Sequence, residues 1–143
     1  MPSEINAACH CKAVKFRVRL LDGLNTARRC TCSFCTMRGA VAVSAAKDGI
    51  VITEGKDALA EYNFNTGQAR HFFCSHCGIY TFHERRSVPG TFGVNLACLE
   101  GHSPFDLASV PVIDGINHPS DGAANRGVVG HLLFVATPQK PAG

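Results

Sequence analysis

Seven of the eight cysteines of this chain fall into three short groups whose spacing suits metal binding. The groups are CHC with Cys9 and Cys11, CTCSFC with Cys30, Cys32 and Cys35, and CSHC with Cys74 and Cys77. Cysteines two or three residues apart are poor disulfide partners for each other but good joint ligands of one ion. The spacing therefore favours bound metal over disulfides.

The two outer pairs together supply four thiolates, which is the number that a closed structural zinc site requires. Side chains two apart on a strand share a face, so Cys9 and Cys11 can reach one ion together. The glycine after Cys77 frees the backbone to turn its N–H groups toward the sulfurs. Each pair taken alone could instead pack as small apolar residues. Other pairings of the cysteines also stay open.

The central group has three cysteines, one fewer than a closed site needs. Cys98 could complete a second structural site, or the fourth position could be left to water or substrate, as in catalytic zinc. Cys98 shares a face with Val94 and Leu96 in GVNLACL, which suits the core. This pattern favours the open site over closure by Cys98.

Composition limits the function classes. The chain has 143 residues, 45% of them hydrophobic and 17% charged, which indicates one globular domain rather than a disordered chain. A net charge of +3 is below that of a typical nucleic-acid binder. Because the sequence has no apolar run suited to a signal peptide or a membrane helix, we expect a cytoplasmic protein with no membrane partner. In that compartment cysteines stay reduced and available to metals.

The elements that must position these cysteines are predicted to be mostly strands. Alternating or β-rich patterns predict strands at 14–20, 40–46, 49–55, 59–65, 91–99 and 127–137, and two more within 70–84 that meet at the CSHC turn. KDG predicts a hairpin between 40–46 and 49–55. Residues 100–127 are expected to form loop, with at most one helical turn near PFDLA.

The ordered series CHCKAVKF, CTCSFCTMRGA, FFCSHCGIYTF and GVNLACLEG resembles the glutathione-dependent formaldehyde-activating enzyme family, to which centromere protein V also belongs. The resemblance runs from residue 9 to about 101. It implies a mainly β, single-domain β-tent fold with zinc-ribbon-like elements. One domain is then expected over residues 1–143, with a core of about 5–137 and a tail at 138–143.

The resemblance also implies two zinc ions per chain. The structural zinc would be held by Cys9, Cys11, Cys74 and Cys77, and the open catalytic zinc by Cys30, Cys32 and Cys35. The implied activity is that of a carbon–sulfur lyase that joins glutathione, or another small thiol, to formaldehyde in S-hydroxymethylglutathione. We hypothesise that the thiol enters the open position as a thiolate. Thr36 and Met37 depart from the family pattern, where a basic residue is common.

Arginines near the central group are candidates for binding the carboxylates of such a thiol, although each alone could be part of a solvated face. They are Arg28, Arg29 and Arg38, with Arg85 and Arg86 farther along the chain. Asn95 could donate to an oxyanion or anchor backbone. His71, His83 and His102 could act as acid or base or lie at the surface, and we name no general base.

Two other function classes compete with the enzyme. One is a non-catalytic, zinc-stabilised module that binds protein or nucleic acid, for which HERRS at 83–87 with Tyr80 and Phe82 could form a basic, aromatic patch. The other is a redox thiol protein that uses Cys98 or the CTCSFC group.

Overall fold

A seven-stranded antiparallel sheet holds most of the chain in this computed structural model, which describes residues 4–64, 69–85, 90–116 and 127–139. In spatial order its strands are β1 (Glu4–Ala8), β2 (Lys15–Leu20), β4 (Ala42–Glu54), β8 (Phe92–Asn95), β7 (Tyr80–Glu84), β6 (Arg70–Cys74) and β5 (Leu59–Tyr62). The mainly β, single-domain prediction is confirmed. In the described parts, no helix is long and apolar enough to cross a membrane.

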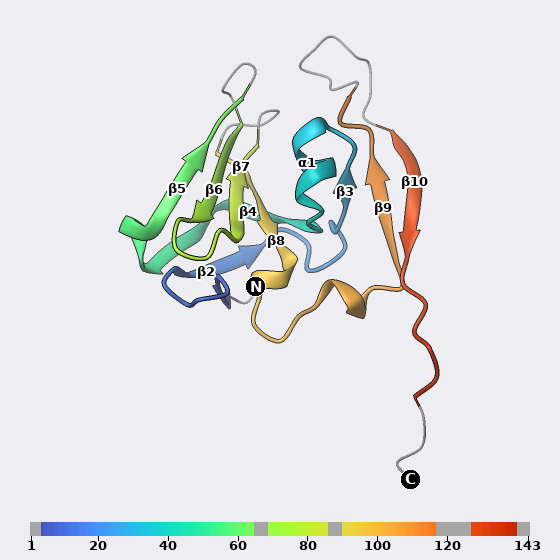
Figure 1. The fold of residues 1–143 in the computed structure, drawn as a ribbon, viewed down its shortest axis with the longest axis horizontal. Helices are drawn as coiled ribbons and strands as arrows, with labels where there is room; N and C mark the ends of the chain where they lie inside the picture. The colour runs from blue at the N-terminus through green and yellow to red at the C-terminus, as the bar shows by residue number, and fades with distance from the viewer. Residues whose placement is uncertain (1–3, 65–68, 86–89, 117–126, 140–143) are drawn as a thin grey trace.

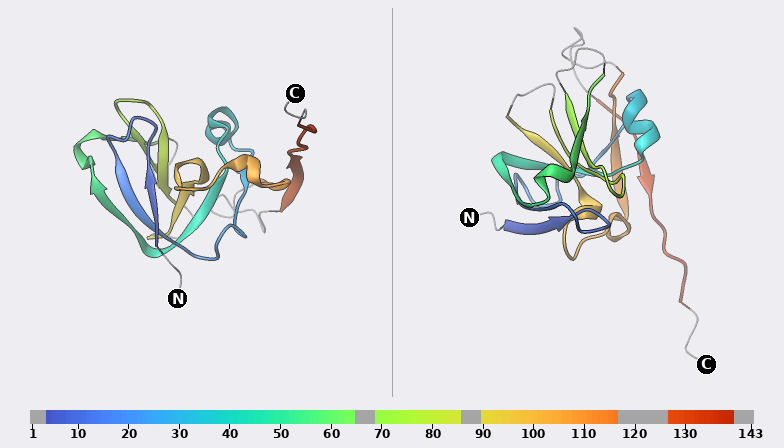
Figure 2. Two further views of the ribbon diagram at one scale, coloured as in Figure 1. Left: turned by 90° about the horizontal axis from the view of Figure 1, so that it is seen from below. Right: turned by 60° about the vertical axis from the view of Figure 1, so that its left-hand side comes forward.

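A smaller sheet lies beside the first. It has the order β10 (Val128–Leu133), β9 (Ser109–Ile113) and β3 (Arg29–Cys30), with β3 parallel to β9. Figure 1 shows the helix α1 (Ser33–Arg38) between the two sheets. Figure 2 shows residues 134–139, which follow β10, running away from both sheets.

The core lies on one face of the large sheet. In β2, Phe16, Val18 and Leu20 are buried, while Lys15 and Arg17 are exposed, as the alternation predicts. Phe16 meets Phe82 of β7 edge-on, with ring centroids 5.3 Å apart. This apolar layer fixes β6 and β7, and with them the turn that carries two of the cysteines.

The predicted hairpin at KDG is wrong. Residues 42–54 form the single strand β4, which pairs with β2 from Leu20↔Ala45 to Lys15↔Glu54. Asp48 adopts a φ of 56° and the pairing register shifts there, so KDG forms an irregularity within the strand. The chain does not reverse because β2 offers a continuous partner to both halves.

Three shorter elements also differ from the sequence-based prediction. The six-residue helix α1 contains the second half of CTCSFC, and β9 lies within the segment 100–127 that was expected to be loop. Cys9 and Cys11 lie at a turn after β1 rather than on a strand. The expected helical turn near PFDLA is present as a 3-10 turn at Pro104–Asp106, with two more at Lys56–Ala58 and Leu96–Cys98. The end predicted for strand 59–65, at Thr66 and Gly67, lies outside the described residues.

Candidate metal centres and active site

Four cysteines from two distant turns meet in one cluster. The sulfurs of Cys9, Cys11, Cys74 and Cys77 all lie within 4.8 Å of one another. Cys11 Sγ is 3.7 Å from both Cys9 Sγ and Cys74 Sγ. This is the donor set of a closed, tetrahedral thiolate site, and it joins the turn after β1 to the turn between β6 and β7.

Backbone N–H groups support the sulfurs of this four-cysteine cluster. Val14 donates to Cys9 Sγ and His76 donates to Cys74 Sγ, each at 3.3 Å. The second turn closes because Gly78 adopts a φ of +77° and donates its N–H to the Cys74 carbonyl. Such donors stabilise thiolates, so the local backbone fits a bound cation.

The other cluster is built around the start of α1. Cys30 ends β3, Cys32 caps the helix and Cys35 lies in its first turn, with all three sulfurs within 4.8 Å of one another. The Cys32 N–H donates to Cys30 Sγ at 3.4 Å, and the Cys35 N–H donates to Cys32 Sγ at 3.3 Å. Hydrogen bonds from the thiols of Cys30 and Cys35 lower the pKa of Cys32 to about 2. Three sulfurs this close carry negative charge together only beside a cation.

Gly115, just after β9, covers one side of this three-cysteine cluster. Its N–H donates to Thr31 Oγ1 at 3.0 Å. A Cβ at this position would overlap the Cys30 sulfur and lie 2.8 Å from the Cys32 nitrogen. Only glycine lets the backbone approach this closely. No motif or spacing in the sequence predicts this role of Gly115, although the DG dipeptide at 114–115 is a turn signal.

Arg38 connects the three-cysteine cluster to its surroundings. Nη2 donates to Cys35 Sγ at 3.5 Å, and Nη1 donates to His71 Nδ1 at 3.0 Å. The guanidinium carbon lies 3.6 Å from the centroid of the Tyr80 ring and 4.7 Å from that of Phe34. These contacts hold the positive charge beside the sulfurs.

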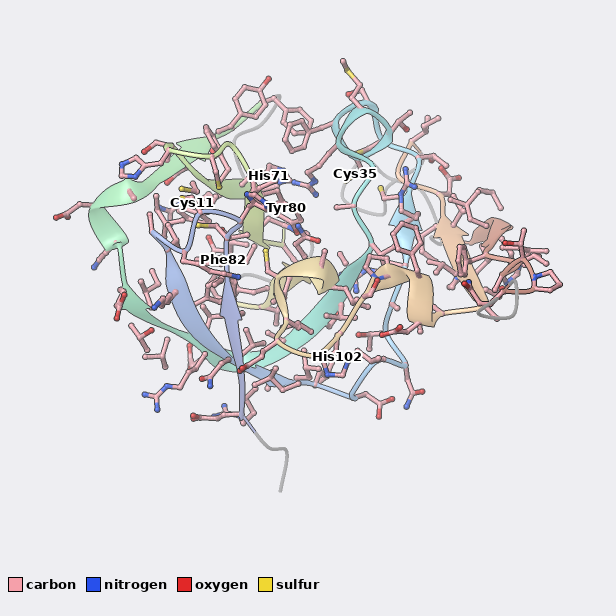
Figure 3. The ribbon with its side chains drawn as sticks, turned by 60° about the horizontal axis from the view of Figure 1, so that its bottom comes forward. Cys11, Cys35, His71, Tyr80, Phe82 and His102 are labelled. Atoms are coloured by element: carbon pink, nitrogen blue, oxygen red, sulfur yellow. The ribbon has the colours of Figure 1, made fainter. Side chains whose placement is uncertain are left out.

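His71 is neutral and accepts a hydrogen bond from Arg38 in this arrangement. It is only 5% exposed, and burial, followed by the positive charge of Arg38, lowers its pKa to about 4. Because arginine can only donate, Nδ1 of His71 must accept, and the ring proton lies on Nε2. In Figure 3, His71 and Tyr80 lie between Cys11 and Cys35, between the two clusters.

Tyr80 and His83 form a second buried pair beside His71. The Tyr80 hydroxyl lies 2.6 Å from His83 Nδ1, and the rings of His71 and His83 stack with centroids 5.2 Å apart. Burial raises the pKa of Tyr80 and lowers that of His83. Both groups are therefore neutral at neutral pH.

A cavity of about 570 Å³ opens between α1 and the strands β6 and β7. Arg38, His71 and Asn95 are among its lining residues, and most of the others are apolar: Phe34, Tyr62, Phe72, Phe73, Ile79 and Tyr80. Phe34 belongs to the CTCSFC segment itself and Arg38 bonds Cys35, so the cavity adjoins the three-cysteine cluster.

Comparison with known proteins decides the family. The sequence description of the glutathione-dependent formaldehyde-activating enzyme family matches residues 4–109. The chain belongs to this family. A crystal structure of a Rhodobacter sphaeroides protein is 49% identical to it, with a TM-score of 0.74, and the alignment covers 76% of this chain and 99% of that one.

The family match ends at residue 109, and part of the site lies beyond it. Gly115 packs against Cys30 and Cys32 from outside the matched segment. Within the match, Met37 lines the cavity and is 88% exposed, and Thr36 Oγ1 donates to the Thr31 carbonyl. Met37 and Thr36, the two residues at which the sequence departs from the pattern expected of the family, thus have different surroundings. Met37 borders the cavity, and Thr36 stabilises the loop before α1.

The predicted substrate-binding residues lie in different places. Of the three arginines in that set, Arg38 lies against both the sulfurs and the cavity. Arg28 donates to the Thr26 carbonyl and to Ser44 Oγ, each at 3.0 Å, and Arg29 lies in β3 with its Nε buried. Neither is among the residues that line the described cavity.

Asn95 lines the cavity, but backbone groups engage both ends of its amide. Nδ2 donates to the Tyr80 carbonyl at 2.9 Å, and Oδ1 accepts from the Ala97 N–H at 3.1 Å. These bonds favour the anchoring role over that of an oxyanion donor.

Cys98 lies apart from the three-cysteine cluster. It is buried, its thiol donates to the Tyr80 carbonyl at 3.5 Å, and it belongs to neither group of metal-compatible residues found in the described chain. Burial, with added repulsion from Cys9 and Cys77, raises its pKa to about 12. A thiol in this environment packs in the core and is a poor redox nucleophile.

The prediction of a basic, aromatic patch for nucleic-acid binding is wrong for its two aromatic residues. Tyr80 and Phe82 are 7% and 4% exposed, so they cannot stack on bases. The Arg85 N–H bonds the Thr91 carbonyl, while Arg86 and Ser87 lie outside the described residues.

Proposed function

We propose that this chain is a zinc-dependent carbon–sulfur lyase of the S-hydroxymethylglutathione synthase type. In the forward direction a thiol adds across the carbonyl of formaldehyde, so that a carbon–sulfur bond forms and the thiol proton ends on oxygen. One observation carries the proposal: within the described residues, the three-cysteine cluster has no fourth cysteine, histidine or carboxylate in its group. The family description supports the same reaction class.

Two zinc ions per chain fit the donor sets. Cys9, Cys11, Cys74 and Cys77 would hold a structural ion, while Cys30, Cys32 and Cys35 would hold a catalytic one. Thiolate sulfur is a ligand that zinc favours, and the N–H donors on the sulfurs suit a charged, metal-bound state. Zinc held by three thiolates supplies a free coordination position that accepts a thiol and favours its thiolate form.

Arg38 is the residue of this chain best placed to act on the substrate. Beside Cys35, its guanidinium offsets the negative charge of the thiolates. Two of its five N–H groups bond Cys35 and His71, so others can donate to the oxygen of a hydroxymethyl adduct. Donors fixed beside a developing oxyanion lower the barrier to addition and to cleavage alike.

His71 and Tyr80 position Arg38 rather than accept protons. Nδ1 of His71 is occupied by the Arg38 N–H, and the Tyr80 ring lies under the guanidinium. The neighbouring cavity has mostly apolar walls, so a substrate that fills it would displace water from this side of the site. The proposed partners are glutathione or another small thiol, with formaldehyde, in the cytoplasm.

An NMR assay with ¹³C-formaldehyde and glutathione tests the proposed reaction. Zinc-loaded protein should accelerate exchange between formaldehyde hydrate and the S-hydroxymethyl adduct. Cys32→Ser should lose this acceleration, and Cys98→Ser should keep it because Cys98 lies outside the cluster. No acceleration by wild-type protein that carries two zinc ions, with glutathione or with another small thiol in its place, or equal rates with Cys32→Ser, would overturn the proposal.

A further inference from the structure

The cavity beside the three-cysteine cluster does not match the reactants of the proposed reaction. Formaldehyde has one carbon and would leave nearly all of the 570 Å³ unfilled. Glutathione carries two carboxylates and an ammonium group. The described lining contains no aspartate, glutamate or lysine and a single arginine, so most of these charges would lack a partner there.

The lining instead matches an apolar group. Phe34, Tyr62, Phe72, Phe73 and Ile79 supply apolar side chains from α1, from β5 and β6 and from the turn before β7. A volume of this size is typical of sites that enclose most of a small organic ligand. Aromatic walls favour an aromatic or branched aliphatic ligand, because stacked and edge-on ring contacts add to the burial of apolar surface.

The polar groups in the cavity limit which polar group a ligand can carry. Asn95 is bonded at both ends to backbone, and the Tyr80 hydroxyl is bonded to His83. Arg38 and His71 are left, and in the described structure Arg38 Nε and His71 Nε2 are buried without a hydrogen-bond partner. Both are N–H donors, so a ligand that satisfies the cavity brings an acceptor oxygen.

We propose that this cavity binds an aromatic or branched aliphatic group of the substrate that carries one carboxylate, with Arg38 as the carboxylate's partner. The natural reactant is then an apolar thiol acid, or the thiol adduct of an apolar carbonyl acid. This inference rests on the proposed function for its chemistry, since Arg38 also contacts Cys35 at the reacting centre. The cavity itself is a binding site whether or not that chemistry occurs.

Three related probes test separately whether the ring and the carboxylate of a ligand contribute to binding in the cavity. 3-Phenylpropionate has the ring and the carboxylate, propionate lacks the ring, and 3-phenylpropanol lacks the charge. Calorimetry on the zinc-loaded protein should show 3-phenylpropionate binding at least about tenfold more tightly than either of the others. Equal affinity for 3-phenylpropionate and propionate would overturn the proposal.

Methyl NMR reports on the cavity without any substitution. The methyl groups of Ile79, which lines the cavity, should shift on addition of 3-phenylpropionate, while those of Ile50 in β4 should not. Ala40→Phe, which adds a ring to the cavity wall, should weaken binding at least about tenfold, and the exposed Val51→Phe should not change it. Binding that leaves Ile79 unshifted would contradict the site even if Ala40→Phe failed to fold.

The formaldehyde assay separates the two proposals. If that assay succeeds and Ile79 does not respond to 3-phenylpropionate, the proposed reaction stands and the cavity proposal fails. If Ile79 responds and no thiol supports the reaction, the cavity binds such acids and the proposed reaction fails.

Discussion

At the scale of single residues, Arg38 and Gly115 decide how the three cysteines are held. Arg38 holds its positive charge beside the sulfur of Cys35, and Gly115 lets the backbone approach the sulfur of Cys30. Neither belongs to the group of metal-compatible cysteines, and the two contact different members of the cluster. Their substitution therefore tests whether the surroundings of the cysteines, and not the cysteines alone, set the affinity for metal.

Gly115→Ala should weaken metal binding at the three-cysteine cluster about tenfold or more, because the added methyl group would displace Cys30. Titration with a competing chelator measures this, and the four-cysteine cluster should be unaffected. Gly130→Ala in β10 is the matched control, since a Cβ there would meet nothing within 4 Å. Equal metal affinity in the two variants would show that the close approach of residue 115 is unimportant.

Arg38→Met should lower metal affinity at the same cluster by about tenfold, since the thiolates lose a neighbouring positive charge. It should also raise the pKa of His71, because the Arg38 charge helps to lower that pKa. Chelator competition measures the metal affinity, and NMR of the histidine ring measures the pKa of His71. Arg17→Met, on the exposed face of β2, is the control, and a similar loss of metal there would argue against a specific role for Arg38.

His71 should make the folded state less stable in acid. Its pKa is about 4 in the fold and about 6.5 when unfolded, so the unfolded chain binds the extra proton first. Stability from this group is complete above about pH 6.5 and is lost as the pH falls toward 4. Denaturant unfolding of wild type and His71→Gln across this range should show the smaller pH dependence in the variant. Parallel curves would contradict a buried, neutral His71.

At the scale of elements, the turns and not the strands carry the chemistry. The turn after β1 and the β6–β7 turn form one cluster, while β3, α1 and the segment after β9 form the other. The first cluster ties together segments more than sixty residues apart, since Cys11 meets Cys74 with a separation of 63. The second sits between the two sheets.

Loss of the two clusters should therefore affect stability differently. Cys74→Ser should lower the Tm of the zinc-loaded protein by at least about 10 °C, because a structural ion contributes its binding free energy to folding. Cys32→Ser should cause a clearly smaller decrease and leave a folded chain with one zinc. Thermal unfolding with parallel metal analysis tests this. Equal destabilisation by both variants would indicate that both ions are structural.

At the scale of the whole molecule, local sequence patterns predicted the strand-rich class and the family but not the way in which distant segments meet. The spacing of the cysteines suggested groups of four and three but left other pairings open, and the resemblance to the family implied the same two groups that the fold brings together. The alternation at 14–20 predicted β2, because a half-buried strand has a two-residue period.

The parts that could not be predicted depend on long-range contacts. Asp48 and Gly49 resemble a hairpin turn, yet β4 continues because β2 pairs with it on both sides of the irregularity. A six-residue helix such as α1 is too short to show a helical period. Gly115 gains its role from β9, whose parallel pairing with β3 no local pattern indicates. The cavity likewise unites side chains of α1, β5 and β6.

The most direct test of the central claim is the electronic spectrum of the Co²⁺-substituted protein during titration with a thiol. If the three-cysteine cluster holds an ion with a free position, millimolar glutathione should increase the sulfur-to-cobalt charge-transfer absorption. The increase should be absent from Cys32→Ser, which keeps the four-cysteine cluster. A spectrum that does not change with any thiol in protein carrying two cobalt ions, or one that changes equally in Cys32→Ser, would contradict the account.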